Sequence, residues 1–218
     1  MLKLEDTYLH KGKRRALVAE LRVKGIKSEK VLEAINLLPR HFFFDTALIS
    51  HAYEDKAFPI GEGQTISQPY TVAFQTELLE VKAGDKILEI GTGSGYQGSI
   101  LHLLGAEVYT IEYQKKLFEG TQRFLKRLGI EMHLFYGDGT GGLPQFAPYD
   151  KIIVTAGAPV VPEALIQQLK IGGILVIPVG DRKRQAMVKI TKKSAKDIVR
   201  EEFDGFAFVP LLGKDGWK

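Results

Sequence analysis

The stretch Lys86-Ile-Leu-Glu-Ile-Gly-Thr-Gly-Ser-Gly95 joins an apolar run to three closely spaced glycines. Residues 86–90 have the β-branched, apolar composition of a short buried strand. A strand that runs into a glycine-rich turn before a helix allows a ligand to approach the backbone where a Cβ atom would block it. The stretch therefore predicts a strand–loop–helix unit at a ligand site. The alternative is an ordinary strand-to-helix turn.

An acid is predicted to lie near this loop. Residues 107–112 have a strand pattern that ends in Glu112, roughly 20 residues after the glycines, the spacing at which a carboxylate meets the ribose hydroxyls of a nucleoside. A dinucleotide fingerprint would need a glycine at position 96, where the chain has Tyr96, so NAD and FAD are disfavoured. The P-loop pattern G-x-x-x-x-G-K-[ST] does not occur in the sequence.

Strands and helices are predicted to alternate from Lys86 onward. Strands are expected at 86–90, 107–112, 131–136, 151–155 and 174–179, and helices at 95–104, 114–128 and 162–170. This order predicts an α/β fold, a Rossmann-like doubly wound and mostly parallel sheet covered on both faces. Three further strands without helices are expected near 186–192, 197–203 and 205–211, so the sheet should finish antiparallel.

The first third of the chain is predicted to be helical at its beginning and end. Amphipathic helices are expected at about 13–24 and 28–38, the second capped by Ser28, and a further helix from Pro69 to about Glu80. Periodicity is lost from His41 to Gln68, which predicts a long loop, and such loops are usually functional.

Composition indicates one ordinary globular domain. Hydrophobic residues make up 44% and charged residues 26% of 218 residues, so we expect a single domain over 1–218. Residues 1–81 would hold the N-terminal helices and a lid loop, and residues 82–218 the cofactor-binding core. The chain contains no cysteine, and its histidines lack metal-ligand spacing, so no metal site is expected.

Charge and hydropathy narrow the expected partners. The net charge of +4 comes from basic residues scattered among acids, so nucleic acid is not expected as a partner. No apolar run has transmembrane length and no signal peptide is evident, so a membrane is not expected as a partner either. We expect a monomer in the cytoplasm.

A family resemblance rests on several strings. The glycine spacing G-x-G-x-G, preceded by Glu89, resembles motif I of S-adenosylmethionine-dependent methyltransferases. The string Gly-Gln-Thr-Ile-Ser-Gln-Pro-Tyr at 63–70 is more specific, and resembles the protein-L-isoaspartate (D-aspartate) O-methyltransferase family. Further matching strings lie at 88–96, 137–139, 147–159, 168–173, 177–180 and 208–211. The resemblance covers roughly residues 14–218, with departures at Thr140 and Ala57.

The resemblance implies repair of damaged proteins. Members of this family methylate the free α-carboxylate of L-isoaspartyl and D-aspartyl residues, with S-adenosyl-L-methionine as methyl donor and S-adenosyl-L-homocysteine as product. The ester then collapses to a succinimide, part of which opens to normal aspartate. The partners would be proteins and peptides that contain isoaspartyl residues. A carboxylate is already ionised at neutral pH, so no general base is required.

The resemblance also implies roles for individual residues. It assigns Gln64, Thr65, Ile66 and Ser67 to a lid over cofactor and substrate. The methionine end of the cofactor would meet Glu89, Gly91 and Gly93, its ribose Glu112, and its adenine Asp138 and Gly139. Tyr113 would also bind the cofactor, and Val209, Pro210 and Leu211 would border the peptide groove.

Two of these assignments have structural alternatives. Ser67 is expected to orient the substrate carboxylate catalytically, beside the positive end of the helix that begins at Pro69. Alternatively, Ser67 only caps that helix. Asp138 between two glycines could instead be a turn aspartate.

Two other functions remain open from the sequence. The first is a class I methyltransferase that acts on a small molecule or on nucleic acid, although the Asn/Asp-Pro-Pro-aromatic motif typical of nucleic-acid amino methylation does not occur in the sequence. The second is a non-catalytic cofactor-binding protein that keeps the fold.

Overall fold

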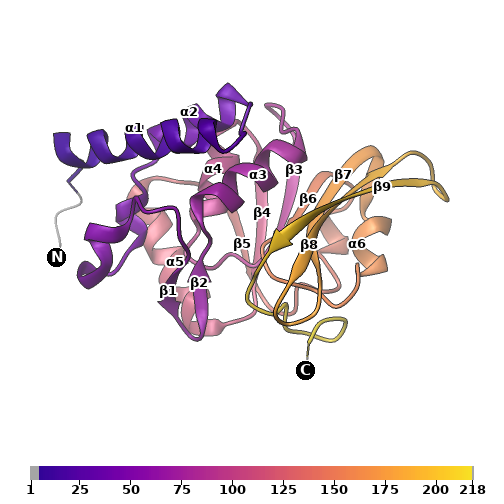
Figure 1. The fold of residues 1–218 in the computed structure, drawn as a ribbon. Helices are drawn as coiled ribbons and strands as arrows, with labels where there is room; N and C mark the ends of the chain where they lie inside the picture. The colour runs from indigo at the N-terminus through magenta and orange to yellow at the C-terminus, as the bar shows by residue number, and fades with distance from the viewer. Residues whose placement is uncertain (1–4, 218) are drawn as a thin grey trace.

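A seven-stranded sheet forms the centre of the molecule (Figure 1). The computed structural model describes residues 5–217. The strands are β3 (Lys86–Ile90), β4 (Glu107–Glu112), β5 (His133–Tyr136), β6 (Tyr149–Val154), β7 (Leu169–Gly180), β8 (Gln185–Lys192) and β9 (Ile198–Phe206). They lie in the order β5-β4-β3-β6-β7-β8-β9, in which the first five are parallel and β8 and β9 are antiparallel. The predicted α/β fold with an antiparallel end is confirmed.

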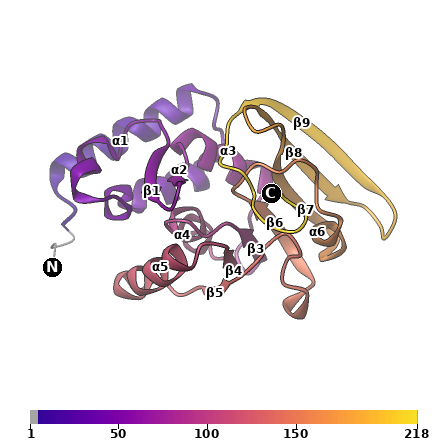
Figure 2. The same ribbon diagram turned by 90° about the horizontal axis from the view of Figure 1, so that it is seen from below.

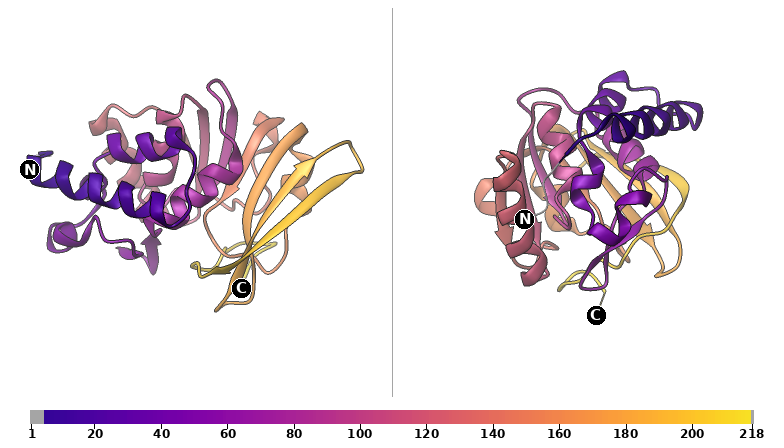
Figure 3. Two further views of the ribbon diagram at one scale, coloured as in Figure 1. Left: turned by 45° about the horizontal axis from the view of Figure 1, so that its top comes forward. Right: turned by 90° about the vertical axis from the view of Figure 1, so that its left-hand side faces the viewer.

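Most helices cover one face of this sheet. They are α1 (Tyr8–Val23), α2 (Glu29–Leu37), α3 (Pro69–Leu79), α4 (Tyr96–Leu103) and α5 (Lys115–Leu128). Helices α1 and α2 pack on α3 and α4 as an outer layer, which Figure 3 shows from two further sides. The short helix α6 (Glu163–Gln167) and the 3₁₀ turn η3 (Pro144–Phe146) follow on the other side of the sheet.

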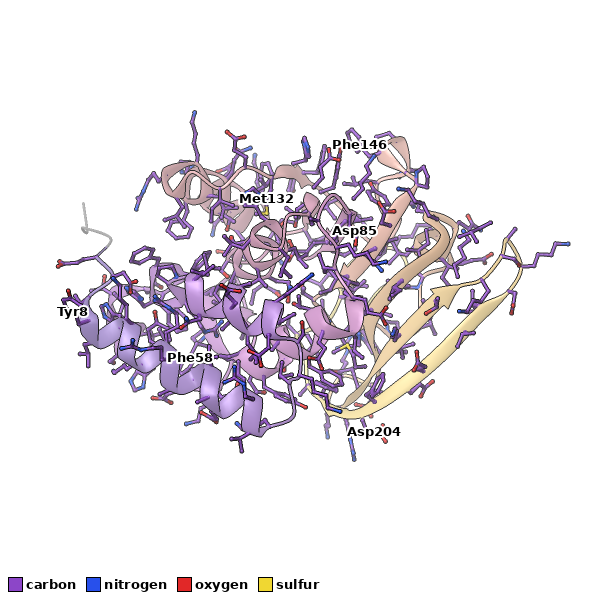
Figure 4. All side chains as sticks on the ribbon, turned by 90° about the horizontal axis from the view of Figure 1, so that it is seen from above. Tyr8, Phe58, Asp85, Met132, Phe146 and Asp204 are labelled. Atoms are coloured by element: carbon purple, nitrogen blue, oxygen red, sulfur yellow. The ribbon has the colours of Figure 1, made fainter. Side chains whose placement is uncertain are left out.

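Side chains on the strands alternate between these two layers. Ile87 and Val108 pack with Leu101 of α4, whereas the neighbouring Leu88 and Tyr109 pack in the cluster that contains Leu165 of α6. This period of two explains why β3 is apolar on both sides, as expected for a buried parallel strand. Figure 4 shows the side chains filling the space between helices and sheet.

The helix starts agree with the prediction except for α1. Ser28 caps α2 by accepting a hydrogen bond from the Val31 N–H, and α3 begins at Pro69, as predicted. Helix α1 begins at Tyr8, about one turn earlier than expected, because Thr7 and His10 form a reciprocal capping box. An apolar pattern does not reveal such a polar first turn.

The prediction of a long loop over residues 41–68 is wrong. This part forms the 3₁₀ turns η1 (Arg40–Phe43) and η2 (Thr46–His51), and the antiparallel hairpin of β1 (Phe58–Gly61) and β2 (Gln64–Ile66). Phe43 is buried against the rings of Tyr96 and Phe124, with centroids 5.2 and 5.1 Å away. Contacts with distant helices therefore order this segment, and its own periodicity does not show them.

The end of the chain also differs from the prediction. The expected strands 197–203 and 205–211 are a single strand, β9, followed by an irregular segment of residues 207–217, here called the C-terminal strap. The strap is held at Gly157, whose N–H donates to the Val209 carbonyl (2.8 Å) and whose carbonyl accepts from the Leu211 N–H (2.8 Å) and the Trp217 ring (2.9 Å). Since Gly157 follows β6, the strap crosses the carboxyl edge of the sheet, which Figure 2 views from below.

Strand β9 forms one edge of the sheet and pairs only with β8. Its exposed side chains include Arg200, Glu201 and Glu202, and Figure 4 labels Asp204 on the same strand.

Within residues 5–217, no helix is both long and apolar enough to cross a membrane.

Candidate active site

A cavity opens at the carboxyl ends of β3, β4 and β6, where an open α/β sheet binds its ligands. Six segments that are distant in the sequence form its walls, together with Val72 of α3. They are β2 with the residue after it, the glycine-rich turn with the start of α4, the end of β4, the turn after β5, the turn after β6 and the strap. The lining residues are 64–67, 72, 90–94, 96, 97, 111–114, 139, 155, 156 and 209–212.

Twelve of the predicted site residues line this cavity. They are Gln64, Thr65, Ile66, Ser67, Gly91, Gly93, Glu112, Tyr113, Gly139, Val209, Pro210 and Leu211. The structure thus brings them together at one edge of the sheet, and their individual roles stay predictions. Glu89 and Asp138 do not line the cavity.

Thr155 and Gly91 hold the glycine-rich turn against β6. Gly91 has a φ of +97°, and a Cβ atom there would lie 2.5 Å from the Thr155 Oγ1. The same Oγ1 lies 2.7 Å from the Gly91 carbonyl oxygen and 3.0 Å from that of Ile90. Only glycine fits this close approach of the Thr155 hydroxyl, so Gly91 allows the turn to pack against the end of β6.

Glu112 faces the glycine-rich turn with a buried carboxylate. Its Oε2 accepts a hydrogen bond from the Gly93 N–H (2.8 Å), and its Oε1 accepts one from the Gln114 N–H (2.8 Å). A carboxylate has about four acceptor sites, so two remain for hydroxyl donors in the cavity. The geometry suits a ligand with a pair of adjacent hydroxyls.

Glu89 lies beneath the turn and not on the cavity wall, contrary to the prediction. Strand alternation directs its side chain toward α4, where it is fully buried and its Oε2 accepts from the Thr110 hydroxyl (2.7 Å). Burial raises the pKa of Glu89 to about 8, with a smaller contribution from the Glu112 charge. At pH 7 this side chain is therefore mostly a neutral acid.

Asp138 is a turn aspartate that anchors the strap. Its Oδ1 accepts from the N–H and the hydroxyl of Thr140 (2.8 and 2.7 Å), and its Oδ2 accepts from the Lys214 N–H (2.8 Å). Partial burial opposes ionisation, but these donors keep the pKa of Asp138 below its ordinary value. The predicted contact of this carboxylate with an adenine is not supported, since it lies outside the cavity wall and faces the strap.

Ser67 lies where two hollows meet. Besides the cavity described above, a second hollow is lined by residues 57, 65, 67, 68, 70, 71, 74, 155 and 203–209. Ser67, Thr65, Thr155 and Val209 line both. A group held in one hollow can therefore meet a group held in the other beside Ser67.

The buried Arg40 fixes the backbone at Ser67. One guanidinium nitrogen donates to the Ser67 carbonyl (2.8 Å), and the Nε donates to the Ala52 carbonyl (3.0 Å). The guanidinium lies 4.7 Å from the centre of the Tyr96 ring, a cation–π contact that helps to hold the cation away from water. Burial lowers the pKa of Arg40.

Ser67 does not cap α3, so this alternative is wrong. The N-cap residue is Gln68, and the Tyr70 N–H in the first turn donates to the Asp55 carboxylate (2.7 Å). The expectation that this positive helix end receives the substrate carboxylate is also corrected, because Asp55 already occupies it.

Three residues that matter for the site were missed from the sequence: Arg40, Gln97 and Thr155. Thr155 follows β6 directly and so lies at the same sheet edge as the other ligand loops, a signal that could have identified it. Gln97 follows the glycine-rich turn directly, and its place in the first turn of α4 could have identified it. Arg40 reaches the site from a segment distant in the sequence, and no local pattern marks it.

A polar cluster outside the cavity brings two histidines together. Potential ligand atoms of Asp6, His10 and His41 all lie within 4.8 Å of one another. Both carboxylate oxygens of Asp6 accept from Arg14 (3.0 and 2.9 Å), and the His41 nitrogens face the Tyr53 hydroxyl (2.7 Å) and a backbone carbonyl (3.1 Å). These bonds use the atoms a metal would need, so the cluster ties α1 to η1.

Comparison with known proteins places this fold and site in one family. The family model described as "Protein-L-isoaspartate(D-aspartate) O-methyltransferase" matches residues 12–216. A protein-L-isoaspartate O-methyltransferase of Cytophaga hutchinsonii is 60% identical, over 98% of this chain and 97% of its own length. One of Christiangramia forsetii is 59% identical, over 96% and 98%.

Two solved structures have the same fold as this chain. A structure of a protein-L-isoaspartate O-methyltransferase matches with a TM-score of 0.82 at 33% identity, covering 93% of this chain and 66% of that longer chain. A putative enzyme of the same kind from Plasmodium falciparum, in complex with S-adenosyl-L-homocysteine, has the same fold, with a TM-score of 0.79 at 24% identity and coverage of 91% and 98%.

Proposed function

The chain belongs to the protein-L-isoaspartate(D-aspartate) O-methyltransferase family, and we propose that the cavity beside Ser67 is where its reaction takes place. The enzyme uses S-adenosylmethionine to methylate the free α-carboxylate of isoaspartyl residues in damaged proteins. The ester then returns to succinimide, and part of this opens to normal aspartate. What remains to be assigned is the role of each residue of this chain.

The cavity has features that suit S-adenosylmethionine. The glycine-rich turn lines the cavity at Gly91 and Gly93, and the Glu112 carboxylate keeps acceptor sites for the two ribose hydroxyls. When bound, S-adenosylmethionine supplies a methyl group on a positively charged sulfur, which becomes the neutral thioether of S-adenosylhomocysteine on transfer. Gly139 lies next to the β4–β5 side of the cavity, where we place the adenine.

The meeting of two hollows at Ser67 is the observation on which the residue assignment depends. We place the methyl donor in the cavity beside β3 and the isoaspartyl residue in the hollow lined by residues 203–209, so that carboxylate and methyl group meet at Ser67. Its neutral hydroxyl can orient the carboxylate without the strong ground-state stabilisation that an arginine would give. Catalysis then comes from positioning and from removing water from the carboxylate.

The second hollow suits an extended peptide of varied sequence. Its wall at residues 203–209 comprises the end of β9 and the start of the strap, in which residues 204, 205 and 207 are exposed. Extended peptides commonly bind such stretches through main-chain hydrogen bonds, which are independent of sequence. Val209, Pro210 and Leu211, held at Gly157, would border this groove. We also propose that the enzyme acts as a monomer in the cytoplasm.

Methyl transfer to a matched pair of peptides tests this function. The purified protein, with S-adenosylmethionine labelled in its methyl group, should label an isoaspartyl peptide and leave the aspartyl peptide of the same sequence unlabelled. The product should lose its label in mild base, as a methyl ester does. Labelling of both peptides alike, or of nucleic acid or a small molecule instead, would contradict the assignment. Cofactor binding without any transfer would favour a non-catalytic role.

A further inference from the structure

Gln97, in the first turn of α4, borders the cofactor cavity and carries a buried acceptor that has no hydrogen-bond partner among the described residues. The residue lines the cavity, yet only 7% of its surface is exposed. Its Nε2 donates to the Thr76 hydroxyl (3.0 Å), whereas its Oε1 has no hydrogen-bond partner within residues 5–217. A buried acceptor without a donor is costly, and in a binding site it indicates a donor on the ligand.

The orientation of this amide is determined by its neighbour. The Thr76 hydroxyl donates its only hydrogen to the Val72 carbonyl (2.7 Å), so toward Gln97 it can only accept. The NH₂ group of Gln97 must therefore face Thr76. If the amide were flipped, two acceptors would face each other, so Oε1 is the atom left without a partner.

The position of Gln97 indicates which part of the ligand it meets. Glu112 and Gly139 reach the cavity from β4 and from the turn after β5. Gln97 is bonded instead to α3, which packs against β6, β7 and β8 at the other side of β3. With the ribose at Glu112 and the adenine at Gly139, the amino-acid part of the ligand extends toward Gln97.

We propose that the Oε1 of Gln97 accepts a hydrogen bond from the α-ammonium group of the methionyl part of S-adenosylmethionine. This rests on the proposed function, since it takes the cofactor's placement from it. The ammonium is the only hydrogen-bond donor in that part of the ligand, because its carboxylate and sulfur have none at neutral pH. Gln97 is thus a binding residue that selects nucleosides carrying an amino acid.

Binding of two nucleosides tests the proposal. S-Adenosylhomocysteine carries the α-ammonium group, and 5′-methylthioadenosine lacks the whole amino-acid part. By calorimetry, Gln97→Met should weaken S-adenosylhomocysteine roughly 10- to 100-fold, as loss of a bond to a charged group does, while leaving methylthioadenosine within about twofold. An equal change for both ligands, or none for either, would overturn the proposal.

Gln75 offers a matched control on the neighbouring helix. It is also buried, and its Nε2 donates to the Val154 carbonyl (3.0 Å) while its Oε1 has no partner within residues 5–217, but it does not line the cavity. Gln75→Met should therefore lower stability without changing the ratio of the two affinities. A change in that ratio as large as that of Gln97→Met would mean that the effect arises from lost packing, and the proposal would fail.

A titration of the unmodified protein tests the proposal without requiring that any variant folds correctly. In nuclear magnetic resonance titrations, the side-chain NH₂ signals of Gln97 should shift with S-adenosylhomocysteine and stay in place with methylthioadenosine. Shifts of equal size with both would contradict the proposal. If neither nucleoside binds at all, the proposed function itself fails, which is a different outcome.

Discussion

The proposed role of Ser67 can be separated from stability, because Ser67 does not cap α3. Ser67→Ala should lower turnover on an isoaspartyl peptide roughly 10- to 100-fold, since a carboxylate oxygen misplaced by about 1 Å can cost that much. The melting temperature and the affinity for S-adenosylhomocysteine should stay nearly unchanged. Ser67→Thr, which keeps a hydroxyl, is the control and should retain most turnover. An alanine variant with unchanged turnover would remove Ser67 from the catalytic assignment.

Glu112 should dominate the binding of the nucleoside. Glu112→Ala should weaken S-adenosylhomocysteine by about 1.5–3 kcal/mol, because the ribose hydroxyls lose a charged acceptor. Asp138→Ala should cost less, since its carboxylate faces Thr140 and Lys214 and not the cavity. Isothermal calorimetry on both variants checks this order, and the reverse order would mean that the two roles are misassigned.

The raised pKa of Glu89 predicts a pH dependence of stability. Its pKa is about 8 in the folded protein and 4.5 in the unfolded chain, so the folded state binds the extra proton between these values. Stability should therefore fall as the pH rises from about 4.5 to about 8. Glu89→Gln cannot lose a proton and should lack this decrease, which amounts to a few kcal/mol on the order-of-magnitude scale of such shifts.

Urea denaturation at pH 5 and pH 8.5 measures this effect. The unmodified protein should lose unfolding free energy between pH 5 and pH 8.5. Glu89→Gln should lose less, so the variant should be relatively more stable at the higher pH. If the unfolding free energies of the two proteins change equally with pH, Glu89 is ionised in the folded state and its pKa is not raised.

At the scale of elements, the strap connects the proposed peptide groove to the turn after β5. Asp138→Ala removes the acceptor of the Lys214 N–H and frees Thr140, whose hydroxyl also lies 3.3 Å from the Asp215 N–H. The strap should then be held mainly at Gly157. We expect a raised KM for the peptide, with kcat less affected and faster proteolysis within residues 207–217.

Asp138→Asn is the control for this prediction, because an amide keeps one acceptor oxygen and the size of the side chain. It should lie between the unmodified protein and Asp138→Ala in both KM and proteolysis. A variant with a loosened strap and an unchanged KM would show that the peptide does not bind against the strap.

The sequence predicted elements where one short pattern decides the structure. Strands β3 and β4 matched their expected bounds because most of their residues are apolar and because a glycine follows β3 and an acid ends β4. The β1–β2 hairpin was missed because it is short and its order comes from Phe58 and Ile60 packing against distant helices. Strand β9 was divided in two at Asp204, next to Gly205, which the structure accommodates within the strand at φ +99°.

At the scale of the whole molecule, the sequence predicts the location of the site, but it does not predict the side-chain directions and hydrogen bonds within it. The carboxyl ends of parallel strands meet at one edge, so Gly91, Glu112 and Gly139 could be placed together from the order of strands alone. Glu89 was misplaced because motif position does not state which face of the sheet a side chain points toward. The Arg40–Ser67 bond joins residues 27 apart, and only the folded chain shows it.

The exposed edge strand β9 affects how this enzyme interacts with the damaged proteins on which it acts. Its clients are damaged proteins, and a partly unfolded chain tends to add its own strands to any free sheet edge. The charged side chains of Arg200, Glu201 and Glu202 make such pairing unfavourable, since a strand docking there would have to desolvate them. We therefore expect the edge of β9 to resist pairing with strands of the damaged proteins that the enzyme meets.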